Sequence, residues 1–163
     1  MAVLPILPVS SPVLHQKSKR VRRIDGSIHR LLDDMVETMR ATGGVGLAAP
    51  QVGVLLRVIV IELSQGEIIE LINPEIVKAT GERELEEGCL CLPGYVGRIK
   101  RSEVVKAKGV DRDGKPVRIK ADELLAEALE HEVDHLNGLL FMDHLESLDD
   151  LHKVEPKPVE EPA

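Results

Sequence analysis

One short motif near the end of the chain constrains the protein more than any other feature: His131-Glu132-Val133-Asp134-His135. In an α-helix, residues four positions apart lie about 40° apart around the axis and one turn apart along it. Both imidazoles can therefore reach one ion, while Glu132 leaves the same turn beside any open coordination position. Metal activation of water with a general base needs this arrangement. The alternative is an exposed helix face that carries two ordinary histidines.

Apolar periodicity predicts two helices. The motif helix is expected to begin near Ala121 or Asp122 and to end near Leu136. An earlier stretch, from Ser27 to about Ala41, repeats apolar residues at i, i+3, i+4, i+7 and i+8. That spacing is typical of an amphipathic helix with one face in the core.

Runs rich in Val and Ile between these helices predict β-strands. We expect them at residues 54–63, 67–72, 102–110 and 117–120. Asn73-Pro74 is expected to end the second strand. Strands grouped between two helices favour an α+β fold over alternating βαβ units.

The length and the end of the chain predict one domain and a tail. A chain of 163 residues leaves little room for two domains. From residue 151 onward there are three prolines, several glutamates and no periodicity. We therefore expect a single catalytic domain over residues 1–150 and a disordered, acidic and proline-rich tail over residues 151–163.

Composition excludes several classes of protein. Tyr95 and Phe141 are the only aromatic residues and the net charge is −7, so neither base stacking nor wholesale phosphate binding is expected, and DNA is not an expected partner. No apolar run reaches the ~20 residues that span a bilayer, so no membrane partner is expected. Five basic residues within 17–23 most simply form a solvated face, and a contact with nearby RNA is the alternative. Cys89 and Cys91 are too few for a disulfide scaffold and indicate a reducing compartment, the cytoplasm.

The histidine motif needs a third ligand, and the residues alone leave its position open. Zincin proteases usually take theirs from downstream, where Asp143, His144 and Glu146 follow. Upstream, Cys89 and Cys91 lie in the glycine-flanked segment EGCLCLPG. A thiolate is a strong soft ligand, and glycines allow a close backbone approach. Either cysteine could instead be an inert core thiol.

A third segment, residues 44–53, reads GVGLAAPQVG. Small residues and a lone amide suit a loop that faces a peptide backbone, and Gln51 could donate its side-chain NH₂ to a developing oxyanion. Glycine-rich loops are more often simple turns, so this segment by itself is a weak indication.

Together, the three segments resemble the peptide deformylase family. Its motifs are GΦGΦAAxQ, EGCΦS and HExDH, where Φ is apolar, and they correspond here to residues 44–51, 87–91 and 131–135. Order and spacing also match. The likeness extends from the Pro-Val-Leu at residues 12–14 to the Phe-Met-Asp at residues 141–143. The resemblance implies an α+β fold with antiparallel β-sheets packed around a C-terminal helix that carries HExxH, together with an N-terminal amphipathic helix.

The resemblance also implies a metal centre. Cys89, His131 and His135 would be the ligands, and Glu132 would be the general acid and base. The cofactor would be one divalent ion per chain, Fe²⁺ in the cell, with Zn²⁺, Ni²⁺ or Co²⁺ able to replace it.

Further site residues follow from the same resemblance. Gln51 and the backbone N–H of Leu90 would form an oxyanion hole, with Glu87 holding the Gln51 amide in place. The substrate-binding residues that we expect are Val45, Gly46, Gly88, Leu124 and Ala128. The last two share the helix face of His131 and could floor an apolar pocket for methionine, plain core packing being the alternative.

The implied activity is hydrolysis of the N-formyl group from the formylmethionine that begins a new polypeptide, with release of formate. The partners would be nascent formyl-Met polypeptides, with transient ribosome proximity, and the location would be the bacterial cytoplasm. Two alternatives stay open: a zincin-type metallopeptidase with a ligand such as Glu146, and a non-catalytic, metal-binding protein with a deformylase-like fold.

The chain departs from the family pattern at three positions. Cys91 stands where the motif usually has Ser, which puts a second thiol near the expected metal. Glu127 stands where several relatives carry an apolar residue in the side-chain pocket. Glu130 replaces a common Gln, and we expect it to face solvent.

Overall fold

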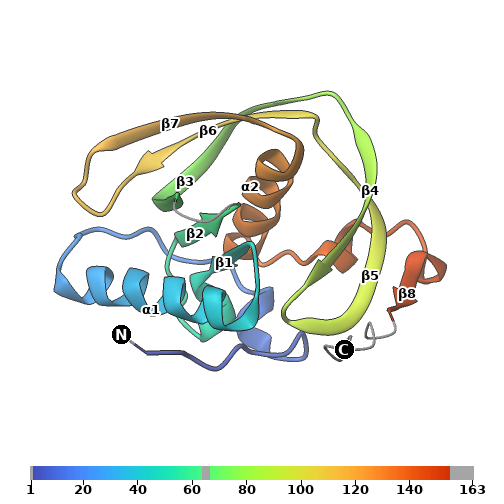
Figure 1. Cartoon of the computed structure of the whole chain (residues 1–163), viewed down its shortest axis with the longest axis horizontal. Helices are drawn as coiled ribbons and strands as arrows, with labels where there is room; N and C mark the ends of the chain where they lie inside the picture. Colours follow the sequence, from blue (N-terminus) through green and yellow to red (C-terminus); the bar gives the residue numbers. More distant parts are fainter. Residues whose placement is uncertain (1, 64–66, 155–163) are drawn as a thin grey trace, which may run out of the picture.

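The structure of the protein is a computed structural model that describes residues 2–63 and 67–154 (Figure 1). It is a mixed α+β fold with antiparallel sheets and, within the described residues, two α-helices, as the sequence predicts. Four short 3₁₀-helices complete these elements: η1 (Pro12–His15), η2 (Ala49–Val52), η3 (Phe141–His144) and η4 (Leu148–Asp150). Neither α-helix combines the length and the apolar character that crossing a membrane would require, within the part of the chain described.

Five strands form an antiparallel sheet in the order β1-β2-β3-β6-β7. They are β1 (Gly46–Ala48), β2 (Val58–Glu62), β3 (Ile68–Thr80), β6 (Val104–Val110) and β7 (Pro116–Asp122). One α-helix covers one face of this sheet over β1 and β2, and a second α-helix covers the other face across all five strands. Residues between the two helices are therefore apolar on either side and buried.

Strand β3 is much longer than the sequence predicts, and the expectation that Asn73-Pro74 ends it is wrong. Asn73 adopts the left-handed conformation, with φ 53°, and the register with β6 shifts between Ile72 and Glu75. The Asn73 side chain accepts a hydrogen bond from Val21 N at 2.8 Å and donates one to Val21 O at 2.9 Å. A bulge with side-chain hydrogen bonds thus carries the strand past the proline.

The three strands of the second sheet were not predicted individually, although the family resemblance implies more than one sheet. The three strands are β4 (Arg83–Cys89), β5 (Leu92–Arg101) and β8 (Leu151–Lys153), in the order β4-β5-β8. The first three residues of the predicted disordered tail are therefore ordered, because Leu151–Lys153 pair with Tyr95–Gly97 of β5. The rest of that predicted tail, from residue 155, lies outside the described residues.

Helix α1 (Gly26–Thr42) begins and ends with clear caps. Asp25 is the N-cap: its carboxylate accepts from Ser27 N at 3.0 Å and from Ile28 N at 3.4 Å. Gly43 ends the helix with φ 72°, which a glycine adopts without strain. The apolar stripe, including Met35 and Met39, packs on one face of the five-stranded sheet.

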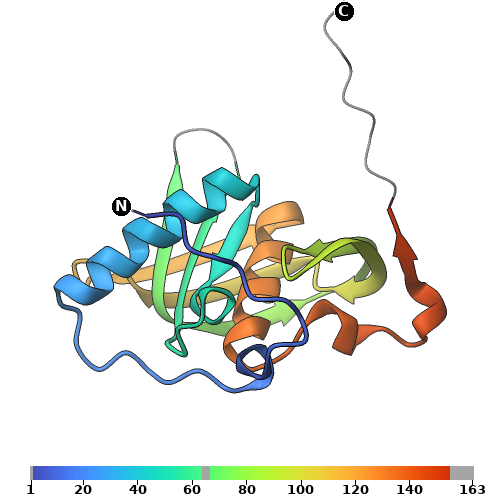
Figure 2. The ribbon, with the colours of Figure 1, turned by 90° about the horizontal axis from the view of Figure 1, so that it is seen from below.

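Helix α2 (Glu123–Leu136) packs on the opposite face of that sheet. Figure 1 shows α2 near the centre of the molecule, between the five-stranded sheet and the β4–β5 hairpin, and Figure 2 shows the same arrangement from below. Its buried apolar residues are Ala126, Ala128, Leu129, Val133 and Leu136. Burial of this stripe fixes the rotation of the helix, and with it the direction of the polar side chains near its end.

Candidate active site

Helix α2 directs three polar side chains of the histidine motif to its buried side. Glu132 and His135 are only 4% and 1% exposed, and the His131 side chain is 11% exposed. Leu129 and Leu136, both fully buried, anchor the helix on the sheet around this turn. The apolar core therefore holds both imidazoles at one end of the helix.

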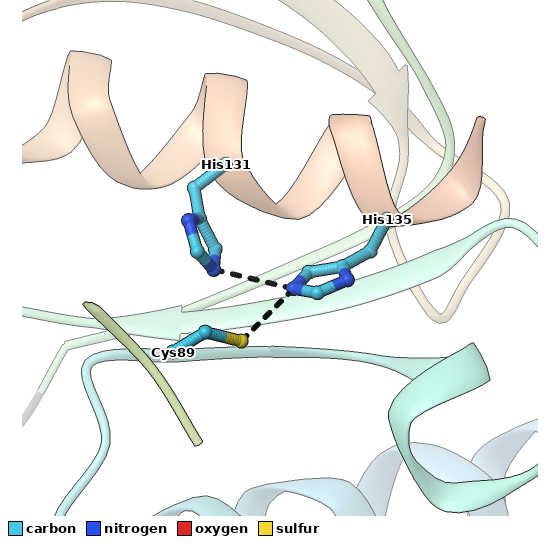
Figure 3. A group of neighbouring side chains, drawn as sticks. All are labelled: Cys89, His131 and His135. Carbon is cyan, nitrogen blue, oxygen red and sulfur yellow. Dashed lines mark hydrogen bonds between the residues drawn. The ribbon is translucent and has the colours of Figure 1, made fainter. Parts of the chain in front are cut away.

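Cys89, the last residue of β4, reaches the same point from the other side. Its Sγ lies 3.4 Å from His135 Nε2, and the two histidine Nε2 atoms lie 3.2 Å apart (Figure 3). A register shift between Gly88 and Cys89 sets the turn at the end of the strand. Cys89, His131 and His135 form a group whose possible ligand atoms all lie within 4.8 Å of one another.

This geometry fits a single tetrahedral ion. With metal–sulfur bonds of ~2.3 Å and metal–nitrogen bonds of ~2.0–2.1 Å, sulfur–nitrogen and nitrogen–nitrogen separations of about 3.6 and 3.3 Å are expected. The separations of 3.4 Å and 3.2 Å agree with both. One sulfur and two imidazole nitrogens suit Zn²⁺ or Fe²⁺, and three protein ligands leave a fourth position for water or substrate.

A buried charge network orients the first of the two histidines. His131 Nδ1 donates to Glu87 Oε2 at 2.6 Å, which leaves Nε2 facing Cys89 and His135. Arg101, 4% exposed, donates two hydrogen bonds to the same carboxylate, at 3.0 Å and 2.7 Å. Although burial raises the pKa of Glu87, the hydrogen bonds from His131 and Arg101 outweigh it and lower that pKa to about 2.

The same guanidinium links the hairpin to α2. Arg101 Nη1 donates to Asp134 Oδ2 at 2.6 Å, and His144 Nε2 donates to that oxygen at 2.7 Å. Burial raises the pKa of Asp134, but the hydrogen bonds from His144 and Arg101 bring it below its usual value. Arg101 thus pairs with two carboxylates, one from β4 and one from α2.

Glu132 is buried against Gly46 at the start of β1. A Cβ at position 46 would lie 2.6 Å from Glu132 Oε2, so any other residue there would displace the buried Glu132 carboxylate. Glu132 Oε1 is buried without a hydrogen-bond partner among the described residues. Burial is the main cause that raises the pKa of Glu132 to about 7, where a carboxylate can both accept and return a proton near neutral pH.

Gln51, in η2, points its side chain at the sulfur atoms. Its Oε1 accepts from Ala48 N at 2.8 Å, which directs Nε2 to Cys89 Sγ at 3.6 Å and to Cys91 Sγ at 3.4 Å. The expectation that Glu87 holds this amide is wrong. Glu87 instead pairs with Arg101 and His131, because a buried carboxylate interacts more strongly with a cation than with a neutral amide.

Gln51, Cys89, His131 and Glu132 line one cavity of about 470 Å³. All five predicted substrate-binding residues line it: Val45, Gly46, Gly88, Leu124 and Ala128. Leu90 lines it as well, together with Leu92, Pro93 and Tyr95 from the β4–β5 hairpin. Leu124 is 46% exposed and lies toward the solvent, whereas Ala128 is buried. The cavity therefore connects the group of metal-binding residues with the surface.

The structure shows the surroundings of three glutamates for which the sequence analysis gave a specific expectation. Glu127 lines the cavity, and burial together with the Glu87 carboxylate raises its pKa to about 7. Glu130 does not simply face solvent, since its carboxylate accepts from Ser102 N at 2.8 Å and from Ser102 Oγ at 3.0 Å. Glu146, the ligand that a zincin would need, makes an exposed ion pair with Lys100 instead.

Sequence reasoning missed Arg101 entirely. The residue continues an alternation in β5, where Gly97 and Ile99 are also buried, so a strand prediction would have put a charged side chain on the buried face. A buried arginine requires carboxylate partners. From that requirement, the sequence could have predicted that Arg101 pairs with carboxylates, which the structure shows to be Glu87 and Asp134.

The chain is similar to known proteins over most of its length. A family model described as Polypeptide deformylase matches residues 3–151. A peptide deformylase of Dehalococcoides mccartyi is 54% identical over 157 residues, covering 96% of this chain and 94% of that protein. One of Alkaliphilus metalliredigens is 56% identical over 145 residues, covering 89% of this chain and 98% of that protein.

The fold is also similar to that of solved structures. A peptide deformylase from Legionella pneumophila superposes with a TM-score of 0.89 at 46% identity, covering 91% of this chain and 89% of that chain. One from Synechococcus elongatus, in complex with actinonin, superposes with a TM-score of 0.86 at 41% identity, covering 90% of this chain and 81% of that chain. The chain belongs to the polypeptide deformylase family.

Proposed function

We propose that the protein is a metal-dependent hydrolase that removes the N-formyl group from the formylmethionine at the start of new polypeptides. Water is consumed, the C–N bond of the formamide is cleaved, and formate and a free amine leave. One observation carries the proposal: Cys89, His131 and His135 converge beside Glu132 and Gln51 at one cavity. A protein that only stored an ion would need neither the buried base nor the amide.

Cys89, His131 and His135 would hold one divalent ion, and we propose Fe²⁺ as the ion in the cell. When bound, such an ion lowers the pKa of a coordinated water from 15.7 to about 7 and polarises a carbonyl oxygen. Glu87 supports this role from outside the ligand set, because its hydrogen bond to His131 Nδ1 fixes the ring orientation.

Glu132 would act as general base and then as general acid. Its carboxylate takes a proton from the attacking water and later gives it to the nitrogen of the leaving amine. The raised pKa, about 7, suits both transfers, because base and conjugate acid are both available near neutral pH. Contact with Gly46 keeps the carboxylate in place at the floor of the cavity.

Gln51 Nε2 and the backbone N–H of Leu90 would stabilise the negative charge that develops on the formyl oxygen. The contact of Gln51 Oε1 with Ala48 N fixes which end of the amide faces the site. A donor that is already oriented needs no reorganisation during the reaction. Removing one such donor typically costs about 3–4 kcal/mol of transition-state stabilisation.

The cavity also suggests why a formyl group is the substrate. A formyl carbon carries only hydrogen, and Gly46, Gly88 and the Cys89–Leu90 segment would form a close wall around it. Leu124 and Ala128 would contact the methionine side chain in the outer part of the cavity. Glu127 adds a carboxyl group there, which makes this part of the pocket more polar than a purely aliphatic one.

The biological setting follows from the substrate. We propose nascent formyl-Met polypeptides as partners, action close to the ribosome, and the bacterial cytoplasm as the location. We also propose that residues 1–150 contain the whole catalytic unit, with β8 as an addition to its second sheet.

Formate release from a formyl-Met peptide, measured anaerobically with the Fe²⁺-loaded protein, tests the proposal. We expect rapid release from that peptide, none from the matching acetyl-Met peptide, and no cleavage of internal peptide bonds. A Cys89→Ser variant should bind less metal by elemental analysis, with Cys91→Ser as its matched control retaining the metal. Cleavage of internal bonds, or full metal content in Cys89→Ser, would contradict the proposed site.

A further inference from the structure

The five-stranded sheet carries five cationic side chains on one exposed area, away from the cavity. These residues, here called the cationic sheet face, are Lys78, Lys106, Lys108, Arg118 and Lys120. Their neighbours along the strands, Val105, Ala107 and Ala121, are buried under α2. Because successive strand residues point to opposite sides, the cations project from the side of the sheet that faces away from α2.

The register puts these cations directly opposite one another. Lys106 pairs with Lys120 and Lys108 with Arg118 between β6 and β7, and Lys78 pairs with Lys106 between β3 and β6. Like charges in directly opposed positions destabilise a sheet. The fold therefore keeps an arrangement that works against its own stability.

Little negative charge compensates this face. Glu75 lies 3.7 Å from Lys108, with both side chains largely exposed, and Asp122 follows Lys120 on the same side of β7. For the other four cations, no carboxylate oxygen lies within 4.0 Å in the described part of the chain. Most of the positive charge is therefore available to a ligand.

The second sheet shows that the chain can pair charges when nothing else is required. Between β4 and β5, Glu84 lies opposite Lys100 and Glu86 lies opposite Arg98. These residues follow the same exposed, alternating pattern as those of the cationic sheet face. With a net charge of −7, anions are also the more abundant charged groups, so an unpaired cationic ladder is not a consequence of composition.

We propose that the cationic sheet face binds the phosphate backbone of double-helical RNA, a local exception to what the net charge of the whole chain predicts. Cations about 4.8 Å apart across the strands and about 6.7 Å apart along them form a rigid array of positive charge. Binding through phosphates is favoured over base stacking or membrane insertion, because the chain's two aromatic residues, Tyr95 and Phe141, lie at the cavity and in the core. RNA is chosen over other polyanions on the strength of the proposed function, since new polypeptides emerge from an RNA-rich particle.

The position of the face suits such a contact. It lies across the sheet from α2, and none of its five cations lines the cavity. An RNA helix bound there would leave the cavity free for a polypeptide. Binding would hold the enzyme near its substrate without a change at the metal site.

A double variant, Lys106→Glu with Arg118→Glu, tests the proposal without weakening the fold. Each replaced residue lies opposite a remaining cation, Lys120 or Lys108, so both like-charge pairs become opposite-charge pairs. The matched control is Arg98→Glu with Lys100→Glu, which changes the net charge equally on the other sheet. The probe is a fluorescein-labelled RNA duplex of about 20 base pairs, followed by fluorescence anisotropy.

For the parent protein with about four phosphate contacts, affinity for the duplex should fall on the order of 100-fold between about 50 mM and about 200 mM salt. The Lys106→Glu, Arg118→Glu variant should bind at least about 10-fold more weakly with a flatter salt dependence, and its melting temperature should be unchanged or higher. The control should retain duplex binding. Formate release from a short formyl-Met peptide should be the same in parent and variant.

Equal duplex binding by parent and variant would overturn the proposal, as would an equal loss in the control, or binding only to vesicles rich in phosphatidylglycerol. The two proposals fail separately. A parent that binds RNA through this face but releases no formate would contradict the enzymatic function alone, whereas normal formate release without RNA binding would contradict this inference alone.

Discussion

The two regions that form the site, helix α2 and the β4–β5 hairpin, are held in place by different forces. Helix α2 buries an apolar stripe on the five-stranded sheet, with Leu129 and Leu136 fully buried. The hairpin places Glu87 and Cys89 through a buried cation, Arg101, which bonds Glu87 within the hairpin and Asp134 on the helix. Hydrophobic burial fixes one half of the site, and a charge network fixes the other.

The difference predicts where mutations act. On α2, the polar side chains can be changed at a cost to the chemistry, because the apolar stripe still anchors the helix. In the hairpin, changing Glu87 or Arg101 affects the fold and the metal site together, since the Glu87 carboxylate contacts both Arg101 and His131.

The largest effect is expected from Glu132→Gln on the helix. Loss of the general base should lower kcat for a formyl-Met peptide about 10²–10⁴-fold. Metal content should not change, because Glu132 is not a member of the ligand group. Steady-state kinetics and elemental analysis measure both quantities. If activity stayed within about 2-fold of the parent, the assignment of the base would be wrong.

Arg101→Met tests the hairpin. Removal of the guanidinium leaves Glu87 and Asp134 buried without their cation, which should lower the free energy of unfolding by about 3–5 kcal/mol. Urea denaturation measures the change. Adding Glu87→Gln to this variant should restore part of the stability, because one of the unpaired charges is then gone. A loss below about 1 kcal/mol would mean that the network does not anchor the hairpin.

Gln51→Ala removes a donor that lies between the two regions. We expect kcat to fall about 10²–10³-fold, with KM and metal content nearly unchanged, because the amide acts on charge that develops in the transition state. Stopped-flow or steady-state measurement of formate release separates kcat from KM. A rise in KM with an unchanged kcat would instead assign Gln51 to substrate binding.

Low pH should remove the stabilisation that Glu87 gives to the β4–β5 hairpin, while the apolar packing of α2 is unaffected. The pKa of Glu87 is about 2 in the folded protein and 4.5 ordinarily, so its ionised form stabilises the fold above pH 4.5. That contribution, on the order of 3 kcal/mol, should be lost as the pH falls from 4.5 toward 2. The urea midpoint should fall less steeply with decreasing pH for Glu87→Gln than for the parent protein. Parallel curves for the two proteins would show that ionised Glu87 does not stabilise the fold.

The smallest effect concerns the junction of the two regions. Glu123, the first residue of α2, has φ 47°, a left-handed conformation that is strained for any residue with a Cβ. Arg83 of β4 donates a hydrogen bond to its backbone carbonyl, which a glycine would retain. Glu123→Gly should therefore raise the free energy of unfolding by about 0.5–1 kcal/mol, as measured in urea. A loss of stability would show that the Glu123 side chain matters more than its backbone.

Regular periodicity made part of the fold predictable. The stripe that includes Met35 and Met39 indicated α1 to within about one residue at each end. The β4–β5 hairpin was missed because its strands lack a run of Val and Ile: the exposed positions are charged, and the buried ones include Gly97 and Arg101. The continuation of β3 past Pro74 was missed because a bulge with Asn73 side-chain hydrogen bonds leaves no apolar pattern in the sequence.

In the candidate site, too, some groupings of residues could be predicted from the sequence and others could not. His131, Glu132 and His135 could be grouped from helical geometry alone, because neighbours on a helix turn are close whatever the rest of the fold does. The choice between Cys89 and a downstream carboxylate such as Glu146 needed either a family resemblance or coordinates. The pairing of Glu87 with Arg101 rather than with Gln51 needed the coordinates.

The sequence by itself determined the local chemistry of this protein: a helix with two imidazoles and a carboxylate on one turn, a thiol between glycines, and an amide in a glycine-rich loop. Tertiary structure decided which of these groups meet, which buried cation pairs with Glu87 and Asp134, and that five cations gather on one face of an acidic chain. The physical reason is the separation along the chain over which each kind of interaction acts. Helical spacing acts over a few residues, whereas strand register and buried charge pairing join residues that are far apart in the chain.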